Sequence, residues 1–271
     1  MGFRNLWLRL PSFIRLRIYH ILIKVGLRLY EPTGSHRCYK LPFNLYAKFG
    51  GNVFIAEADA MRYISSHTTA PVPSVVDAIP VPTGAFIVMT GLPGTEMFDR
   101  LQRMSTSELA LLAQDLKASF EQIRSLPPPT SGPRVSGFGG GNFRCFRIDS
   151  DPIGPFATEG DFYQYIYEHA WATERERLEH IAQKVHSTPY KLCLTHNDLA
   201  PHNILLDGNN RLSGIVDWEC CAWMPEYWEY TRSCYVRDGY TQWLHLMGEV
   251  FGTWPEELAV EKEFWYCNDP W

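Results

Sequence analysis

Residues 194–206 read LTHNDLAPHNILL, and residues 215–219 read IVDWE. These segments place Asp198, Asn203 five positions later and Asp217 fourteen positions beyond that, each beside an apolar, strand-like run. A catalytic aspartate followed by an asparagine and a second aspartate that bind Mg²⁺ is the arrangement that holds nucleotide phosphates for phosphoryl transfer. The two segments therefore predict a phosphoryl-transfer site, with Asp198 as the base and Asn203 and Asp217 as metal ligands.

The sequence between these motifs predicts a β-hairpin. Residues 204–206 and 212–216 are largely apolar and flank the turn-forming run DGNN at 207–210. A hairpin there would bring Asn203 at one end beside Asp217 at the other. Two oxygen ligands suit Mg²⁺, which takes few protein ligands and fills its remaining positions with phosphate and water.

The same residues resemble the catalytic core of the aminoglycoside phosphotransferase and choline kinase group. The likeness covers about residues 39 to 230, and the run WECCAWMPEYWEY at 218–230 resembles the fungal-type branch of that family. It implies an α+β, bilobal protein-kinase-like fold with a small antiparallel-sheet N-lobe and a mostly helical C-lobe. It also implies Mg²⁺-dependent transfer of the γ-phosphate of ATP (or GTP) to a hydroxyl of a small molecule. His196 matches the family's loop histidine, which is expected to order the loop.

The resemblance extends to residues that would hold the nucleotide. Lys48 ends a strand-like run and precedes a predicted helix that carries Glu57. In kinase-like folds such a Lys–Glu pair neutralises the α- and β-phosphates. Spacing alone leaves open a surface lysine and a solvated glutamate, and the likeness of residues 46–73 to the family's N-lobe favours the pair. Met89 and Thr90 match the lobe connector, where backbone groups would meet the adenine.

The chain is expected to have three parts. Residues 1–30 would form a basic amphipathic helix, residues 31–90 an N-lobe with the nucleotide-binding sheet and helix, and residues 91–271 a helical C-lobe with the catalytic loop and the metal-binding hairpin. Within the C-lobe, STSE at 105–108 is a capping box that predicts the start of a helix. The Pro- and Gly-rich stretch 127–155 is predicted to be a functional surface loop.

Charge is distributed unevenly along the chain. Residues 1–30 contain six Lys and Arg and no acidic residue, whereas the remainder has 19 basic against 30 acidic residues, so that +6 and −11 combine to a net charge of −5. Nucleic acid binds basic surfaces, so an acidic body of this kind predicts no nucleic-acid partner. A small-molecule acceptor is expected instead.

The N-terminal segment also has an apolar face at helical periodicity, which predicts a helix over residues 12–30. The residues of that face are Ile14, Ile18, Ile21, Leu22, Val25 and Leu29. A basic amphipathic helix can lie on an anionic membrane. The favoured expectation is a helix packed on the body, with its arginines in water.

Features of the whole chain predict a cytoplasmic location. Basic residues interrupt each apolar run well short of a membrane span, and no small-residue cleavage site follows, so neither a transmembrane helix nor a signal peptide is expected. The seven cysteines are an odd, scattered set without a C-x-x-C pair, and no N-x-S/T acceptor occurs. The thiols are expected to be reduced and to act as small apolar fillers.

Two other functions remain open. No G-x-G-x-x-G precedes Lys48, and GSH at 34–36 would form at most a short phosphate-covering turn. A catalytically weak or inactive pseudokinase acting as a binding module is therefore the alternative, although all four catalytic-type residues are present. A metal hydrolase using His196, His202 and the two aspartates has less support, because the histidines lie six positions apart and not at the i, i+4 spacing of a helical zinc site.

Overall fold

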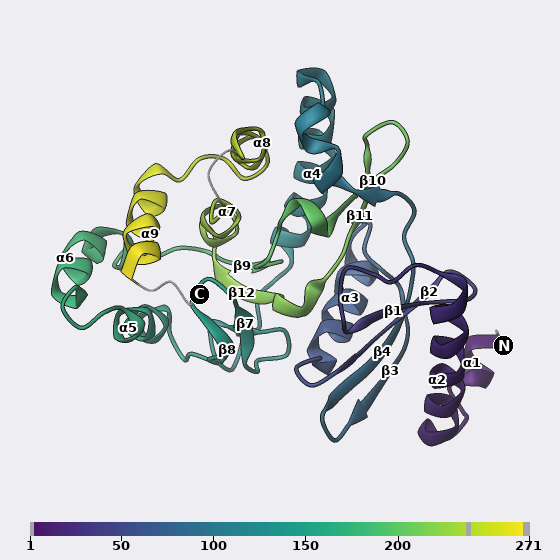
Figure 1. Cartoon of the computed structure of the whole chain (residues 1–271). Helices are drawn as coiled ribbons and strands as arrows, with labels where there is room; N and C mark the ends of the chain where they lie inside the picture. Colours follow the sequence, from purple (N-terminus) through teal and green to yellow (C-terminus); the bar gives the residue numbers. More distant parts are fainter. Residues whose placement is uncertain (1–2, 237–239, 268–271) are drawn as a thin grey trace. The chain divides into compact units, whose positions relative to one another are not determined.

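The structure is a computed structural model that describes residues 3–236 and 240–267 (Figure 1). The chain forms two compact units, one made of Met1–Ser66 and Val72–Leu92, the other of His67–Pro71 and Pro93–Trp271. The first contains an antiparallel sheet and the second is mostly helical. The predicted α+β fold class is confirmed.

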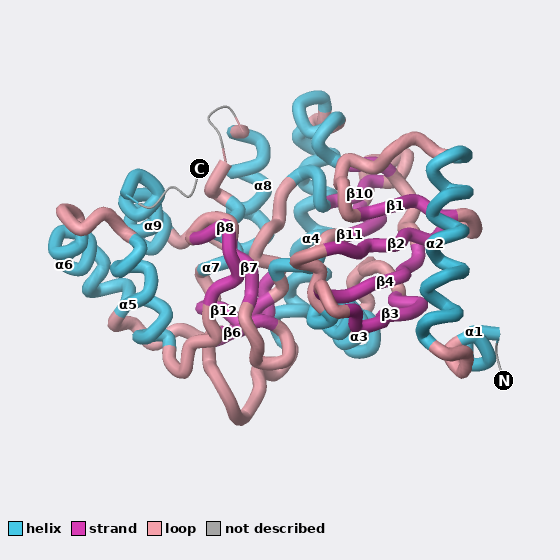
Figure 2. The backbone as a smooth tube through the Cα atoms, turned by 60° about the horizontal axis from the view of Figure 1, so that its bottom comes forward, coloured by secondary structure: helices cyan, strands magenta, loops and turns pink. Residues whose placement is uncertain are grey.

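The first unit is built on a four-stranded antiparallel sheet, which Figure 2 shows in magenta. Its strands, in spatial order, are β1 (Cys38–Leu41), β2 (Leu45–Gly50), β4 (Gly84–Thr90) and β3 (Val75–Val81). Five consecutive residues of β4 are buried, because both faces of this central strand are covered. On one face, residues from α2 (Ser12–Leu29) join the core, and on the other Lys48 of β2 reaches Glu57 of α3 (Ile55–His67).

The predicted N-terminal helix is present, but only part of its predicted apolar face packs on the sheet. Ile21 and Leu29 are 59% and 62% exposed, whereas Tyr19, Ile23 and Gly26 are buried against the sheet. The Tyr19 ring stacks on Phe86 of β4 at a centroid distance of 5.7 Å. At Gly26 an added Cβ would lie 2.0 Å from the Lys40 carbonyl oxygen, so glycine permits the close approach of helix and strand. The helix has two apolar arcs, and specific contacts select the one that packs.

Two polar contacts fix this choice of face. Arg15 of α2 forms an ion pair with the buried carboxylate of Asp77 in β3, and the Tyr19 hydroxyl donates to the same carboxylate at 3.0 Å. The indole N–H of Trp7, at the end of α1 (Phe3–Trp7), donates to the Tyr19 hydroxyl at 2.6 Å. Helical periodicity counts apolar residues and therefore missed an arc that includes an arginine and a glycine.

The second unit opens with β5 (Thr95–Glu96), two 3₁₀ turns η1 (Met97–Asp99) and η2 (Leu101–Arg103), and the long helix α4 (Thr106–Ser125). The predicted capping box is confirmed, since the Ser105 hydroxyl accepts from the Glu108 backbone N–H and the Glu108 carboxylate accepts from the Ser105 N–H. Four further helices are α5 (Glu159–His169), α6 (Arg175–His186), α8 (Thr241–Phe251) and α9 (Pro255–Cys267).

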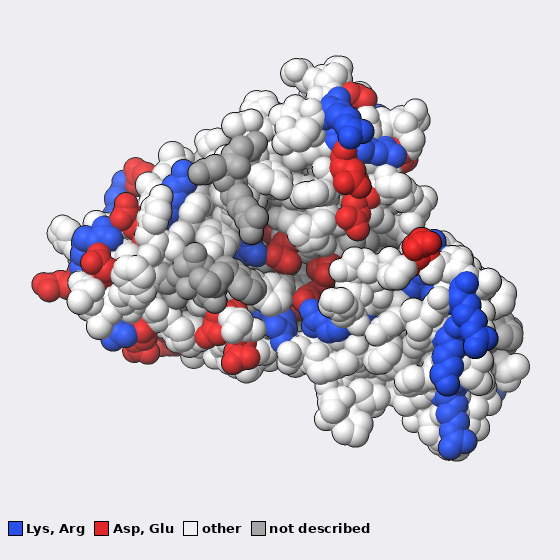
Figure 3. All heavy atoms as spheres, viewed as in Figure 1, with Lys and Arg blue, Asp and Glu red and all other residues white. Residues whose placement is uncertain are grey.

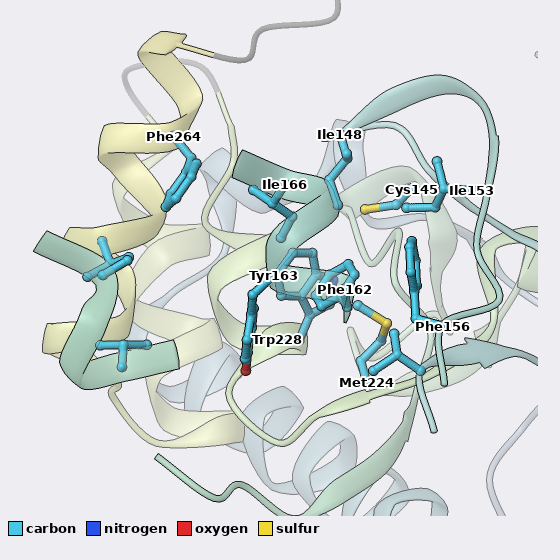
Figure 4. Close-up of a cluster of buried hydrophobic side chains, with 14 of the residues drawn as sticks. Cys145, Ile148, Ile153, Phe156, Phe162, Tyr163, Ile166, Met224, Trp228 and Phe264 are labelled. Carbon is cyan, nitrogen blue, oxygen red and sulfur yellow. The ribbon is translucent and has the colours of Figure 1, made fainter. Parts of the chain in front are cut away.

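The core of this unit is rich in aromatic side chains (Figure 4). The Phe162 ring of α5 packs edge to face on the Trp228 ring, with the ring centroids 5.1 Å apart. Its centroid also lies 5.5 Å from that of the Phe156 ring. Trp228 is fully buried, and so is Phe264 of α9. Large rings of this kind contribute much of the apolar surface that a domain removes from water. Trp228 begins the short helix α7 (Trp228–Ser233), so this core holds α7 in place.

The stretch predicted as a surface loop, residues 127–155, is only partly irregular. It contains β6 (Ser136–Gly137), β7 (Phe143–Cys145) and β8 (Asp149–Ile153), and β7 and β8 form a hairpin. All three residues of β7 are buried. Its Phe143 and Cys145 belong to the aromatic core, which the Pro and Gly content of the sequence concealed.

None of the seven cysteines, all of which lie in the described residues, forms a disulfide. Six of them are buried, and Cys38 is partly exposed. Burial raises the pKa of the thiols of Cys145, Cys193 and Cys220 above the ordinary value, so these groups stay protonated at neutral pH. None of the described helices is long and apolar enough to span a membrane.

Candidate active site

The candidate catalytic loop follows a buried strand of the second unit. Strand β9 (Leu192–Thr195) pairs with β12 (Ala222–Pro225), which also pairs with β6. All four residues of β9 are buried, and they fix the start of the loop that carries His196 and Asp198. The loop ends in the 3₁₀ turn η3 (Pro201–Asn203).

The predicted hairpin is present and brings its two ends together. Strand β10 (Ile204–Leu206) pairs with β11 (Leu212–Ile215), with Ile204 opposite Ile215. Just beyond that pair, the Val216 N–H donates to the Asn203 carbonyl at 2.9 Å. Asp217 follows in a left-handed conformation with φ 64° and begins the turn η4 (Trp218–Cys220). The amide and the carboxylate thus flank one end of a hairpin.

Asn203 is also tied to the loop, because its Nδ2 donates to the Asp198 carbonyl at 2.9 Å. The Asp198 carboxylate accepts from Arg232 of α7, with Nη2 and Oδ1 2.5 Å apart. Burial raises the pKa of Asp198 to about 6, Arg232 opposes this rise, and the charge of Asp217 adds to it. The three predicted residues therefore lie in one electrostatically coupled cluster.

His196 is fully buried and uses both ring nitrogens to hold this cluster. Its Nε2 lies 2.8 Å from the Val216 carbonyl oxygen, and its Nδ1 accepts from the Asp198 N–H at 3.3 Å. Burial lowers its pKa to about 4, so the ring is neutral at physiological pH. Its Nε2 then carries the proton and donates a hydrogen bond to the Val216 carbonyl. The ring thereby links the loop to the end of β11.

Glu229 is a residue of this site whose position sequence reasoning missed. Its carboxylate is fully buried beneath the loop. One oxygen accepts from the His196 N–H at 2.5 Å and the other from the Asn197 N–H at 3.2 Å. Burial raises its pKa to about 7. Because α7 lies more than thirty positions from the loop, local sequence carried no signal of this contact.

Asn197 was also missed. It adopts the left-handed conformation with φ 62°, which asparagine tolerates better than most residues. Its Nδ2 donates to the carbonyls of Arg144 and Cys220, and its Oδ1 accepts from the Trp228 indole N–H at 2.8 Å. The sequence did contain a signal for this conformation, because asparagine is enriched at left-handed backbone positions.

In the first unit, Lys48 and Glu57 form the predicted pair. The Nζ of Lys48 lies 2.9 Å from a Glu57 carboxylate oxygen, and both side chains are less than 5% exposed. Met89 and Thr90 end β4, where Met89 is buried and the Thr90 hydroxyl accepts from the Ser74 N–H at 3.1 Å. Because Lys48 is buried, the alternative of a surface lysine is wrong. A buried lysine requires a counter-charge, which Glu57 supplies.

Comparison with known proteins decides the family. Residues 54–261, about three quarters of the chain, match the model of the phosphotransferase enzyme family. The chain belongs to that family. The predicted relationship and enzyme class, that of a small-molecule kinase, are confirmed, and the fungal-type branch stays a prediction.

Solved structures of this phosphotransferase fold are similar at low sequence identity. A thermostable mutant of aminoglycoside phosphotransferase APH(4)-Ia, in ternary complex with ADP and hygromycin B, is 15% identical with a TM-score of 0.59 over 87% of this chain and 83% of that one. The gentamicin–APH(2″)-IIa complex is 15% identical, TM-score 0.60, over 94% and 86%. APH(3″)-Id from Streptomyces rimosus ATCC10970, with ADP and streptomycin, is 16% identical, TM-score 0.55, over 94% and 98%. At these identities the likeness shows the shared protein-kinase-like fold.

The donor set at the hairpin end of this phosphotransferase fits a hard cation. Asn203 offers an amide oxygen, since its Nδ2 is already used as a donor, and Asp217 offers a carboxylate. Within the described parts of the chain, no three His, Cys, Asp or Glu residues form a group that could hold a metal. The hydrolase hypothesis lacks its ligand cluster there, whereas a two-ligand magnesium site does not require one.

A pocket of about 490 Å³ adjoins Asp198 in the second unit of the phosphotransferase. Its polar lining includes Asp198, His202 and Arg232, of which Asp198 and Arg232 form an ion pair. The rest of the pocket is lined by small apolar residues and by four aromatic ones, which are Phe98, Phe146, Tyr235 and Tyr240. The pocket thus combines an aromatic wall with a candidate base.

Proposed function

We propose that this chain transfers the γ-phosphate of ATP or GTP, with Mg²⁺, to a hydroxyl of a small molecule. The observation that carries the proposal is that Asn203 and Asp217 flank the same end of one hairpin, with Asn203 hydrogen-bonded to the backbone of Asp198. A carboxylate beside two oxygen ligands suits a reaction that gains rate by positioning and charge neutralisation.

Asp198 would accept the proton of the attacking hydroxyl, or orient that hydroxyl toward the phosphorus. Its Oδ1 is held by Arg232, so the carboxylate has a fixed orientation with its other oxygen available for the acceptor. His196 and Glu229 would position this residue from behind, because they bind the backbone that carries it. The loop is therefore preorganised by its own His196 and by two side chains of α7, Glu229 and Arg232.

Asn203 and Asp217 would hold Mg²⁺ through the Asn203 Oδ1 and the Asp217 carboxylate. When bound, the ion neutralises charge on the phosphates. Lys48, oriented by Glu57, would bind phosphate oxygens, and the backbone at Met89 and Thr90 would meet the base of the nucleotide. The buried Lys48–Glu57 pair supports this role, since a rigid ammonium binds an anion at a lower entropic cost.

The proposed nucleotide site can be tested by thermal stabilisation with ATP and with GTP, each with and without Mg²⁺. Nucleotide at about 100 times its Kd should add about 2.7 kcal/mol of stability, which corresponds to a few degrees in Tm. Asp217→Ala is expected to lose the Mg²⁺-dependent part of the shift. Asp99→Ala, at an exposed aspartate of the same unit, is the matched control and should keep it. No shift with either nucleotide would favour the pseudokinase alternative.

For the acceptor, we infer a hydroxyl compound with an aromatic or apolar body and no dense positive charge. Asp198 is the one carboxylate among the described lining residues of its pocket, and Arg232 already neutralises it. This neutral ion pair would give a polycation no net attraction, whereas the aromatic wall would bind an apolar body.

An acceptor panel with labelled γ-phosphate tests this inference. Neutral or anionic aromatic alcohols should be phosphorylated better than polyamine-bearing sugars. Phe98→Ala should raise the KM for the acceptor by roughly 10-fold or more with little change in kcat, because it removes an apolar contact. Trp171→Ala, at an exposed aromatic residue outside the pocket, is the control. Preferred turnover of polycations would contradict the inferred acceptor class and leave the kinase proposal intact.

A further inference from the structure

The outward face of α2 carries an unusual combination of residues for a helix exposed to water. Arg17, Lys24 and Arg28 are exposed there, and Figure 3 shows Lys and Arg side chains running along the surface of this helix. Large apolar side chains are exposed on the same helix and on the segment before it: Leu6, Leu8, Leu10, Phe13, Ile21, Leu27 and Leu29. A surface helix normally places polar residues on its solvent face.

The helical spacing mixes the two kinds of residue on one face. Phe13, Arg17 and Lys24 lie within about 40° around the helix axis, and Ile21 and Leu27 lie about 40° to either side of them. The opposite face, with Tyr19 and Ile23, is the one that packs on the sheet. The exposed apolar residues are therefore not part of the core.

We propose that α1 and α2 dock this phosphotransferase onto an anionic lipid surface. Charge complementarity decides the partner, since residues 1–30 carry six cations and no acid while the rest of the chain is acidic. Long basic side chains reach lipid headgroups while apolar side chains between them enter the interface. Phe13, Ile21 and Leu27 are each more than half exposed, so their side chains are available to enter that interface.

The rigid attachment of α2 supports this proposal. Arg15 pairs with the buried Asp77, and Gly26 lets the helix contact β1 closely. The helix is thus held with its packed face against the sheet, and the cations and apolar residues of the other face stay presented together. A helix that needed to refold for membrane binding would lose that advantage.

The test is flotation of the full-length protein with vesicles of phosphatidylcholine alone and of phosphatidylcholine with about 30% phosphatidylserine. Binding to the anionic vesicles only, weakened at high salt, is the expected result. The triple variant Arg17→Gln, Lys24→Gln, Arg28→Gln should bind roughly 100-fold more weakly. Phe13→Ser with Ile21→Ser and Leu27→Ser should also lose binding.

A matched control removes three exposed cations from the second unit, through Arg103→Gln, Lys117→Gln and Lys191→Gln. This variant should float like the wild type, and unchanged melting temperatures should show that every variant is folded. Equal binding of the control and the α2 variant would overturn the proposal, as would absence of binding to both vesicle types. A dimer in solution that the Phe13, Ile21 and Leu27 changes dissociate would assign the face to self-association and would also overturn it.

Discussion

Asp198→Asn is expected to lower kcat for phosphoryl transfer by roughly 10²- to 10⁴-fold. The substitution preserves the shape of the side chain but removes the group that would accept the proton of the acceptor. Nucleotide binding should persist, because the proposed nucleotide and metal ligands (Lys48, Asn203 and Asp217) are unchanged. Single-turnover transfer of labelled γ-phosphate measures the loss, and the Mg²⁺-dependent melting shift measures nucleotide binding.

This prediction needs a control for stability, since Arg232 is largely buried and would lose its counter-charge. A loss of about 1–3 kcal/mol of stability is expected from that alone. Assays well below the melting temperature of the variant separate the two effects. Asp99→Asn, at an exposed aspartate, should keep full turnover. Retention of turnover within a few-fold by Asp198→Asn would sink the assignment of this residue as the base.

Glu229→Ala is expected to destabilise the protein by roughly 2–6 kcal/mol, because it leaves the backbone N–H groups of His196 and Asn197 buried without their acceptor. Turnover should fall as well, since those groups hold the loop that carries Asp198. Glu229→Gln is the matched variant, because its amide oxygen still accepts one N–H bond. Chemical denaturation of both variants, with kcat measured on the folded fraction, tests the role of this residue.

The charge of Glu229 gives this comparison a second readout. Its folded-state pKa of about 7 lies above the ordinary value of 4.5, so the folded chain retains a proton that the unfolded chain releases. The stability that Glu229 contributes should be fully present below pH 4.5 and should be lost as pH rises toward 7. Glu229→Gln should lack that decline. Identical pH dependence of the wild type and Glu229→Gln would contradict the burial of an ionisable group at this position.

The sequence predicted the parts of the site that are local. The hairpin turn at 207–210 and the apolar runs beside it were sufficient to place Asn203 next to Asp217, because strand pairing fixes the register of a short hairpin. The capping box at Ser105 predicted the start of α4 for the same reason, since its donors and acceptors lie within four residues.

Long-range contacts were not predictable from a single sequence. Glu229 and Arg232 reach the catalytic loop only because the aromatic core around Trp228 positions α7, and nothing near His196 or Asp198 encodes that packing. The face of α2 that packs most closely differs in part from the predicted one for a related reason. A sheet selected it through Asp77, Phe86 and the backbone of Lys40, which are distant in sequence.

The buried thiols can serve as internal probes of local unfolding. Cys193 lies in β9, Cys220 in η4, Cys234 directly after α7 and Cys267 in α9, and each is inaccessible to a water-soluble alkylating reagent in the closed fold. Once Cys38 is replaced by serine, the rate at which each remaining thiol is modified reports how often its own segment unfolds. The order in which they react would therefore rank the local stabilities of the loop support, α7 and the C-terminal helix without any introduced label.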